Sequence, residues 1–169
     1  MQSAQFIYLL VAFMLFSSFS VALNRFQVAS TITTVEAQQA NDAVSLSQML
    51  FEEAWTLSYD EVTVPANQVA QGDLDFPEDF TAPKSLGPDS GEKYPNFDDV
   101  DDFNGLDYQL LYGADSLRVQ GEVRYINIKL DTLVTYSAAY NKLVKFTITS
   151  PRSNMELTFE YIYSYLGSD

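Results

Sequence analysis

The chain has no cysteine and no histidine among its 169 residues. The absence of cysteine excludes a disulfide framework, cysteine-bound zinc and thiol catalysis. The absence of histidine removes the commonest general base and the commonest ligand of transition metals. Carboxylates, lysine, serine and tyrosine still allow some chemistry, but this composition favours a protein that is not an enzyme.

Proline and glycine are missing from residues 1–64, and charged residues are missing from residues 1–24. Residues that break helices therefore occur only after this long N-terminal block. The block opens with the apolar run Phe6–Leu23 and continues as an amphipathic stretch to about Tyr59. We predict one helix over residues 1–59, and its part from Phe6 to Tyr59 is by itself about 80 Å long at ~1.5 Å per residue. A helix of that length does not fit inside a small domain, so its first part must contact lipid or copies of itself.

The apolar run has three interpretations. It suits a secretory signal cleaved after Ser20-Val21-Ala22, although no basic residue precedes it. It also meets the lower length limit for a membrane anchor, and Arg25 then weakly favours a cytoplasmic position for the rest of the chain. In the third interpretation the helix begins in the membrane and ends in a filament core, where Ser17 and Ser18 would allow close helix–helix approach.

For the third interpretation, we assign residues 1–27 to the membrane or filament core. The core-forming side chains are then Phe6, Ile7, Leu9, Leu10, Phe13, Met14, Leu15, Phe16, Phe19 and Leu23. The β-branched stretch Val28–Val35 has low helix propensity and predicts a local kink or a short linker. Beyond Glu36, a broad apolar stripe at helical spacing is expected to pack on a sheet. It comprises Ala40, Ala43, Val44, Met49, Leu50, Phe51, Ala54, Trp55 and Leu57.

The remaining sequence divides into a loop region and a strand region. Residues 60–116 are acidic and hold most of the prolines, which predicts a long variable loop. Residues 117–169 alternate as strands: Leu117–Tyr125, a slip of phase at Ile126, Leu143–Ser150, a turn at Pro151, and Met155–Tyr165. The predicted fold is α+β, with the second half of the helix packed on a small antiparallel sheet.

The net charge of −14 is concentrated in residues 36–116, where only Lys84 and Lys93 oppose many acidic side chains. Nucleic-acid binding is not expected, because a phosphate backbone requires a basic face.

One short acidic segment is a candidate cation site. Its oxygen-bearing side chains are Asp98, Asp99, Asp101, Asp102, Asn104 and Asp107. Crowded carboxylates repel one another, and Ca²⁺ relieves that repulsion with oxygen ligands. The spacing does not match an EF-hand. The alternative is a solvated acidic turn whose side chains bond the local backbone, and no cofactor other than Ca²⁺ is expected.

Two motifs and the overall layout resemble known filament proteins. Phe97–Gly105 (FDDVDDFNG) and the pair Lys145–Pro151 (KFTITSP) and Glu156–Phe159 (ELTF) are similar to segments of type IV pilins and pseudopilins. The resemblance is notable for minor pilins of the mannose-sensitive haemagglutinin type. It implies a pilin-like subunit that assembles with itself or with other pilin-like subunits. The protein would occupy the inner membrane before assembly and an extracellular filament of the cell envelope afterwards.

The chain departs from the pilin pattern at its N-terminus. Prepilins have a glycine at the cleavage point and a glutamate soon after it, but neither residue occurs before Glu36. Such a loss is compatible with a minor or initiating subunit and also with a relative that does not polymerise. The alternative function is therefore a membrane-anchored or secreted binding domain that never forms filaments.

Overall fold

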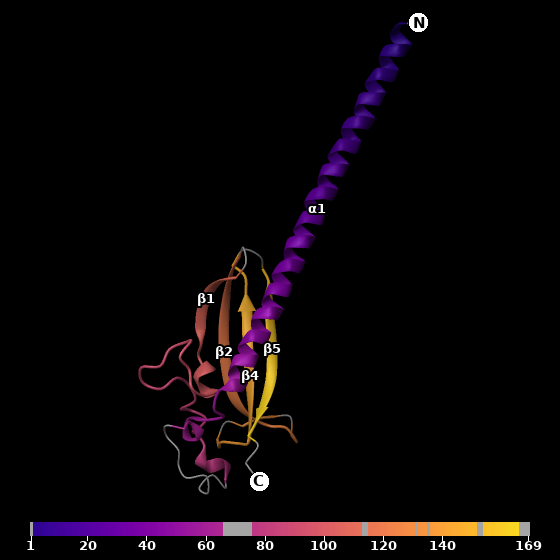
Figure 1. Cartoon of the computed structure of the whole chain (residues 1–169). Coiled ribbons are helices and arrows are strands. Elements are labelled where there is room, and N and C mark those ends of the chain that lie inside the picture. Colours follow the sequence, from indigo (N-terminus) through magenta and orange to yellow (C-terminus); the bar gives the residue numbers. More distant parts are fainter. Residues whose placement is uncertain are drawn as a thin grey trace. The chain divides into compact units, whose positions relative to one another are not determined.

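The chain forms one long helix followed by a small antiparallel sheet, which confirms the α+β prediction (Figure 1). The computed structural model describes residues 2–65, 76–112, 115–130, 132–134, 136–151 and 154–165. The elements are α1 (Gln2–Thr56), η1 (Glu61–Thr63), η2 (Pro77–Asp79), η3 (Asp101–Phe103), β1 (Asp107–Tyr112), β2 (Asp115–Asn127), β3 (Thr132–Leu133), β4 (Asn141–Thr149) and β5 (Glu156–Ser164).

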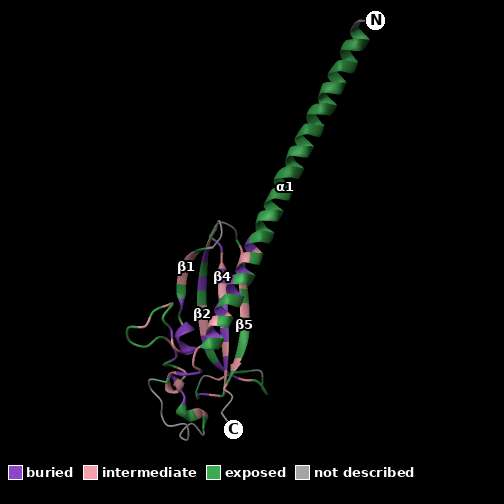
Figure 2. Ribbon diagram, in the orientation of Figure 1, coloured by how far each residue is buried: buried purple, intermediate pink, exposed green. Residues whose placement is uncertain are grey.

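The contacts divide the chain into two units, residues 1–39 and residues 40–169. In the first unit every described side chain from residue 3 to residue 38 is exposed (Figure 2). The large apolar side chains Phe6, Met14 and Phe16 are 62%, 69% and 68% exposed. This part of α1 therefore has an apolar surface that the described protein leaves uncovered.

The β-branched stretch Val28–Val35 is fully helical, so the linker prediction is wrong. Three threonine hydroxyls donate to the carbonyl four residues earlier: Thr31 to Gln27, Thr33 to Ala29 and Thr34 to Ser30. Such hydrogen bonds satisfy the hydroxyl within the helix and accommodate residues of low propensity.

In the second unit, residues 40–56 of α1 pack on the sheet through a narrow stripe. Ala43, Leu46, Leu50 and Ala54 are buried, at the spacing of one helix face. The Phe51 ring lies 5.0 Å from that of Phe146 on β4. The predicted stripe was too broad and omitted Leu46. Its members Val44, Met49 and Trp55 are exposed, and Trp55 touches the sheet only at its margin, with its ring 5.2 Å from that of Tyr161.

Helix α1 ends at Thr56 rather than near Tyr59, because the next residues pair with a distant segment. Ser58 forms a parallel bridge with Asp99. The Ser58 N–H donates to the Asp98 carbonyl at 3.1 Å, and the Val100 N–H donates to the Ser58 carbonyl at 3.0 Å. These bonds fix the acidic segment beside the end of the helix.

The sheet has the order β1-β2-β4-β5, with β3 also paired to β2. Strands β4 and β5 form the predicted antiparallel hairpin, in which Phe146 faces Phe159. Val144, Phe146 and Ile148 alternate as buried residues, as expected. Two residues of the predicted turn between these strands, Arg152 and Ser153, lie outside the described residues.

Strands β1 and β3 were not predicted from the sequence. Strand β1 lies inside the region predicted to be loop, and β2 begins at Asp115. The slip of phase in β2 coincides with a change of partner: Tyr125 pairs with Lys142 of β4, whereas Ile126 pairs with Leu133 of β3. Both Tyr125 and Ile126 are buried, which fits a bend at this point.

Gly121 allows the segment after η3 to cross β2 at close range. A Cβ atom at this position would lie 2.3 Å from the Phe103 carbonyl oxygen. The Gly121 N–H donates to the Leu106 carbonyl, and the Gly105 N–H donates to the Gly121 carbonyl. A side chain at this position would push the crossing segment away from the strand and disturb both hydrogen bonds.

We therefore predict that Gly121→Ala lowers the free energy of unfolding by about 1–3 kcal/mol, the usual cost of overpacking. Chemical denaturation of the full chain measures this change. Gln120→Ala, at the exposed neighbouring position of the same strand, is the matched control. Equal stabilities of the two variants would contradict the close-approach argument.

Candidate functional site

The acidic segment forms the turn η3, and its carboxylates are largely interior. Asp99, Asp101 and Asp102 are each at most 2% exposed. Asp99 Oδ1 accepts hydrogen bonds from the N–H groups of Asp101 and Asp102, at 2.6 and 3.2 Å. Asp102 Oδ2 accepts from the N–H groups of Asp98 and Asp99, at 3.1 and 3.4 Å. Local backbone bonding thus occurs as in the alternative prediction, but the side chains of this turn are buried rather than solvated.

The other two predicted ligands bind elsewhere. Asn104 links three segments, because its Nδ2 donates to the Leu86 carbonyl and its Oδ1 accepts from the Val123 N–H. Asp107 lies on β1 and accepts from Nε of Arg118 at 2.7 Å. Arg118 and its hydrogen bond hold the pKa of this exposed carboxyl below its ordinary value. The six residues therefore do not converge on one point.

A smaller acidic group does converge. Carboxylate oxygens of Glu92, Asp98 and Asp102 lie within 4.8 Å of one another. The sequence prediction included Asp98 and Asp102 but missed Glu92. Glu92 precedes the acidic segment in the sequence, and the fold of the loop brings its carboxylate close to theirs. These three oxygens are of the type that Ca²⁺ prefers, and cation binding here stays a prediction.

The most unusual feature of the region is Lys142, whose side chain is completely buried. Its Nζ donates to Oδ2 of Asp60 at 2.7 Å and to the Tyr59 carbonyl at 2.7 Å, and it also contacts Oδ1 of Asp101. It lies 4.3 Å from the centre of the Tyr59 ring and 5.3 Å from that of Tyr125. Strand β4 thereby joins the residues before η1 to the turn η3.

Sequence reasoning missed Lys142, although the sequence contained a signal. Lys142 has the same alternation phase as Val144, Phe146 and Ile148 on β4, so it points toward the same interior. A lysine in the buried phase of a strand requires acidic partners. Those partners, Asp60 and Asp101, are far away in the sequence and could not be assigned from it.

The buried carboxyls have displaced pKa values. Burial raises the pKa of Asp99 to about 8, and the neighbouring carboxylates Asp101 and Asp102 add to this shift. Burial also raises the pKa of Asp101 to about 7, although the charge of Lys142 opposes this shift. Burial raises the pKa of Asp102 to about 6, although hydrogen bonds from backbone N–H groups oppose it. Asp60 is different: burial opposes its ionisation, but Lys142 and several hydrogen bonds hold its pKa below the ordinary value.

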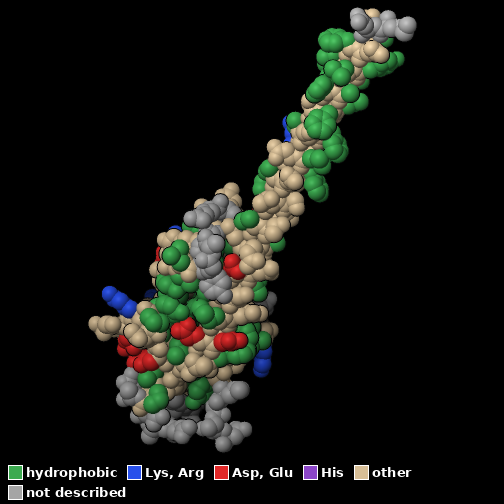
Figure 3. All heavy atoms as spheres, turned by 45° about the horizontal axis from the view of Figure 1, so that its top comes forward, with side chains coloured by type: hydrophobic (Ala, Val, Ile, Leu, Met, Phe, Trp, Pro, Cys, Tyr) green, Lys and Arg blue, Asp and Glu red, His purple; other side chains and the backbone are tan. Residues whose placement is uncertain are grey.

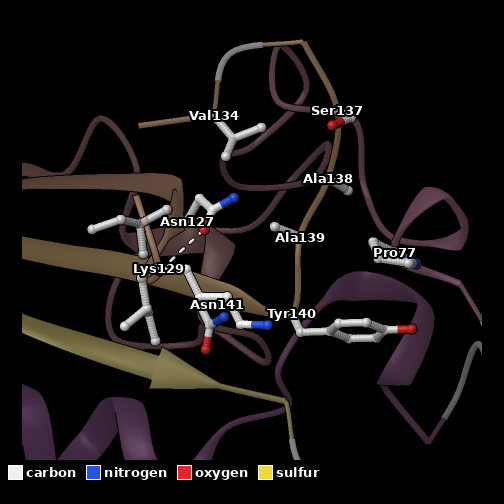
Figure 4. A pocket seen from close by; sticks show the side chains of 11 residues that line it. Pro77, Asn127, Lys129, Val134, Ser137, Ala138, Ala139, Tyr140 and Asn141 are labelled. Carbon is white, nitrogen blue, oxygen red and sulfur yellow. Dashed lines mark hydrogen bonds between the residues drawn. The ribbon is translucent and has the colours of Figure 1, made fainter. Parts of the chain in front are cut away.

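A separate cavity of 610 Å³ lies beside the end of β2 (Figure 4). Apolar side chains supply much of its lining, among them Ile126, Val134 and Ala138. Its polar lining residues are Asn127, Lys129, Ser137, Tyr140 and Asn141. Among them, the Lys129 N–H donates to Oδ1 of Asn127 at 3.1 Å. These residues do not combine a nucleophile with a carboxylate base.

The predicted filament-core residues all lie on the exposed part of α1. From Phe6 to Leu23 their exposed fractions range from 44% for Leu10 to 69% for Met14. Figure 3 shows large hydrophobic side chains along this segment. By length and composition, α1 is apolar enough to cross a membrane. A membrane anchor is thus consistent with the helix, and a signal segment near the N-terminus meets the same criterion.

In comparisons with known proteins, no family model, no curated protein and no solved structure matches the chain. The case for any function therefore depends on the residues themselves.

We predict that Lys142→Met destabilises the sheet unit by about 3–5 kcal/mol, because it leaves two buried carboxylates without their cation. Lys145→Met is the matched control on the same strand. Lys145 pairs with Glu122 at a partly exposed position, where such a pair contributes about 0–1 kcal/mol. Thermal unfolding of both variants measures the difference, and similar losses would contradict the interior ion-pair assignment.

The displaced carboxyls also predict a pH dependence. An acidic group whose pKa is higher in the folded state than in the unfolded state stabilises the folded state at low pH. This contribution is fully present below the pKa of the unfolded state and is lost as the pH rises through the pKa of the folded state. Asp99 shifts from 3.8 to about 8, so its contribution should decline between these pH values. The expected loss is on the order of 1 kcal/mol or more, the equivalent of at least one pKa unit.

Melting temperatures of the wild type and of Asp99→Asn at pH 5 and pH 8 test this expectation. Asparagine keeps the acceptor for the N–H groups of Asp101 and Asp102 but has no charge, so the variant should show a weaker decline. Identical pH profiles would contradict the assignment to Asp99.

Proposed function

We propose that the chain is a pilin-like structural subunit that assembles into a filament through the exposed part of α1. The observation that carries this proposal is the unbroken exposure of residues 3–38. Apolar surface of this extent is unfavourable in water, and its burial is the main driving force of association. Lipid or other polypeptide must cover it.

The helical surface continues well beyond the length that a membrane requires. The apolar run Phe6–Leu23 is about 27 Å long at ~1.5 Å per residue, close to the thickness of a hydrocarbon core. Beyond it, Val28, Ile32 and Val35 remain about half exposed. Their spacing of four and three residues is that of a seam between packed helices. A simple membrane anchor does not need this second apolar surface.

A row of small residues accompanies that seam. Ala29, Thr33 and Ala37 repeat at intervals of four residues and line a shallow groove together with Ser30 and Thr34. Small residues at this spacing allow two helices to approach closely, in lipid or in a protein core. The hydroxyls of Thr33 and Thr34 are bonded to their own helix, so they do not require polar partners at such a contact.

Assembly would proceed from the membrane of the cell envelope into a filament. Apolar helix can leave lipid for a stack of like helices because both environments are apolar, so packing decides the balance. Each helix would contact neighbours through different surfaces, and such heterologous contacts generate open filaments. The sheet unit would form the outer surface, and other pilin-like subunits are further partners.

We predict that Leu15→Asp abolishes filament assembly while the sheet unit stays folded. A carboxylate in the middle of an apolar helical stack is strongly unfavourable, at roughly 2.5–3.5 kcal/mol for a membrane-like environment. Electron microscopy of sheared cell-surface material measures assembly. Leu130→Asp is the matched control, because Leu130 is 69% exposed in the sheet unit. Normal filaments of Leu15→Asp would contradict the proposal.

Thr33→Leu separates assembly from membrane anchoring. This substitution lies outside the apolar run and keeps the membrane-length segment intact, but it fills the row of small residues. The expected result is normal recovery of the chain in the membrane fraction and at least a tenfold loss of filaments. A wild-type chain that stays membrane-bound without high-order self-association would instead support a non-polymerising anchored domain.

A further inference from the structure

Lys142 is enclosed between two carboxyl groups that come from separate parts of the chain. Its side chain and that of Asp60 are 0% exposed, and that of Asp101 is 3% exposed. Nζ of Lys142 contacts Oδ1 of Asp101 directly and lies 2.7 Å from Oδ2 of Asp60. An amine and two carboxyls are thus held together in the interior of one unit, beside the rings of Tyr59 and Tyr125.

The two carboxyls are bonded very differently. Asp60 Oδ1 accepts from the N–H and the hydroxyl of Thr81, and its Oδ2 accepts from the Tyr125 hydroxyl as well as from Lys142. These donors stabilise Asp60 as a carboxylate. Among the described residues, Oδ2 of Asp101 is buried and has no hydrogen-bond partner. Asp101 is therefore the carboxyl on which burial disfavours charge.

This arrangement favours a reaction between Lys142 and Asp101. Transfer of one proton from the ammonium group to Asp101 replaces two buried charges by a neutral amine and a neutral carboxyl. The nitrogen lone pair is then in contact with the carboxyl group, and a fixed contact of this kind replaces a bimolecular encounter by an intramolecular step. Asp60 touches the same nitrogen, so it can accept a proton from it and return that proton to the departing hydroxyl.

We propose that Lys142 and Asp101 form an intramolecular isopeptide bond, with Asp60 moving the proton. A bond forms between Nζ of Lys142 and Cγ of Asp101, and the bond between Cγ and Oδ1 breaks. Oδ1 leaves as one molecule of water, which carries the proton first transferred from the ammonium group and the proton that Asp60 delivers. Asp60 ends the reaction as the carboxylate with which it began, and no oxidant, reductant or cofactor takes part.

The bond would join the acidic turn η3 covalently to the central strand β4. A cross-link between distant positions restricts the unfolded chain and stabilises the fold, as a disulfide does. The chain has no cysteine, so the isopeptide bond would provide the stabilisation that a disulfide provides in other proteins. This proposal does not depend on filament assembly, since all three residues lie in the unit of residues 40–169.

Peptide mapping of the full wild-type chain, purified in detergent and then denatured, tests the proposal. Trypsin should release residues 94–118, which contain Asp101, joined to residues 130–145, within which cleavage after Lys142 is blocked. The joined species should be lighter than the sum of its two parts by one water. Recovery of these segments only as separate peptides of full mass, with normal cleavage after Lys142, would overturn the proposal. Processing at the N-terminus does not affect either segment.

Three variants test the roles of the residues. Lys142→Arg should yield no joined peptide, whereas the matched Lys145→Arg on the same strand should yield as much as the wild type. Asp60→Asn keeps the shape but cannot accept the proton, so the joined peptide should form at least about 100-fold more slowly. An undiminished rate in Asp60→Asn would overturn the role of Asp60. Loss of the joined peptide in Lys145→Arg would overturn the assignment to Lys142. Circular dichroism checks that each variant folds, and the wild-type measurement stands even where one does not.

Discussion

The first part of α1 presents apolar side chains that the described part of its own chain does not cover, and this is the constraint on which the protein's organisation depends. Every described side chain of residues 3–38 is exposed, whereas residues 40–169 contain two clusters of buried apolar residues. The sheet unit therefore buries a hydrophobic core of its own. The first part of the helix does not, so its apolar surface requires lipid or other polypeptide around it.

A second constraint governs the sheet unit, where a polar cluster connects segments that apolar packing alone does not fix. The described residues of 60–65 and 76–106 have as regular elements only the short turns η1, η2 and η3, yet Asp60, Asp99 and Asp101 are buried. Lys142 connects two of these carboxylates to β4. Asp99 accepts from the backbone of η3, and Asp102 accepts from the backbone just before it. Such a cluster is costly to desolvate but strongly disfavours any arrangement that leaves a charge unpaired. The acidic segment is thus an interior junction, and the carboxylates of Glu92, Asp98 and Asp102 come together at its margin.

The sequence predicted the parts of the fold that follow from local patterns. The lack of proline and glycine before Val64 predicted the helix, and strict alternation predicted the β4–β5 hairpin, since each signal acts within a few residues. Strand β1 was missed because Leu110 and Leu111 are adjacent and break the alternation. The linker alternative for Val28–Val35 failed because helix propensity is only a weak preference, and α1 continues through these residues. Side chains that meet across long sequence separations, such as Lys142 and Asp60, depend on the folded arrangement and leave only partial signals.

The most direct test of the central claim is the mass of the N-terminal peptide in protein recovered from sheared cell-surface material. The account predicts that this protein retains residues 6–23, because an apolar helix leaves the membrane readily only when other helices cover it. A chain that begins near Leu23 would mean that the apolar run is a cleaved signal. That result would contradict filament assembly through α1 and would leave a secreted domain built on the β-sheet.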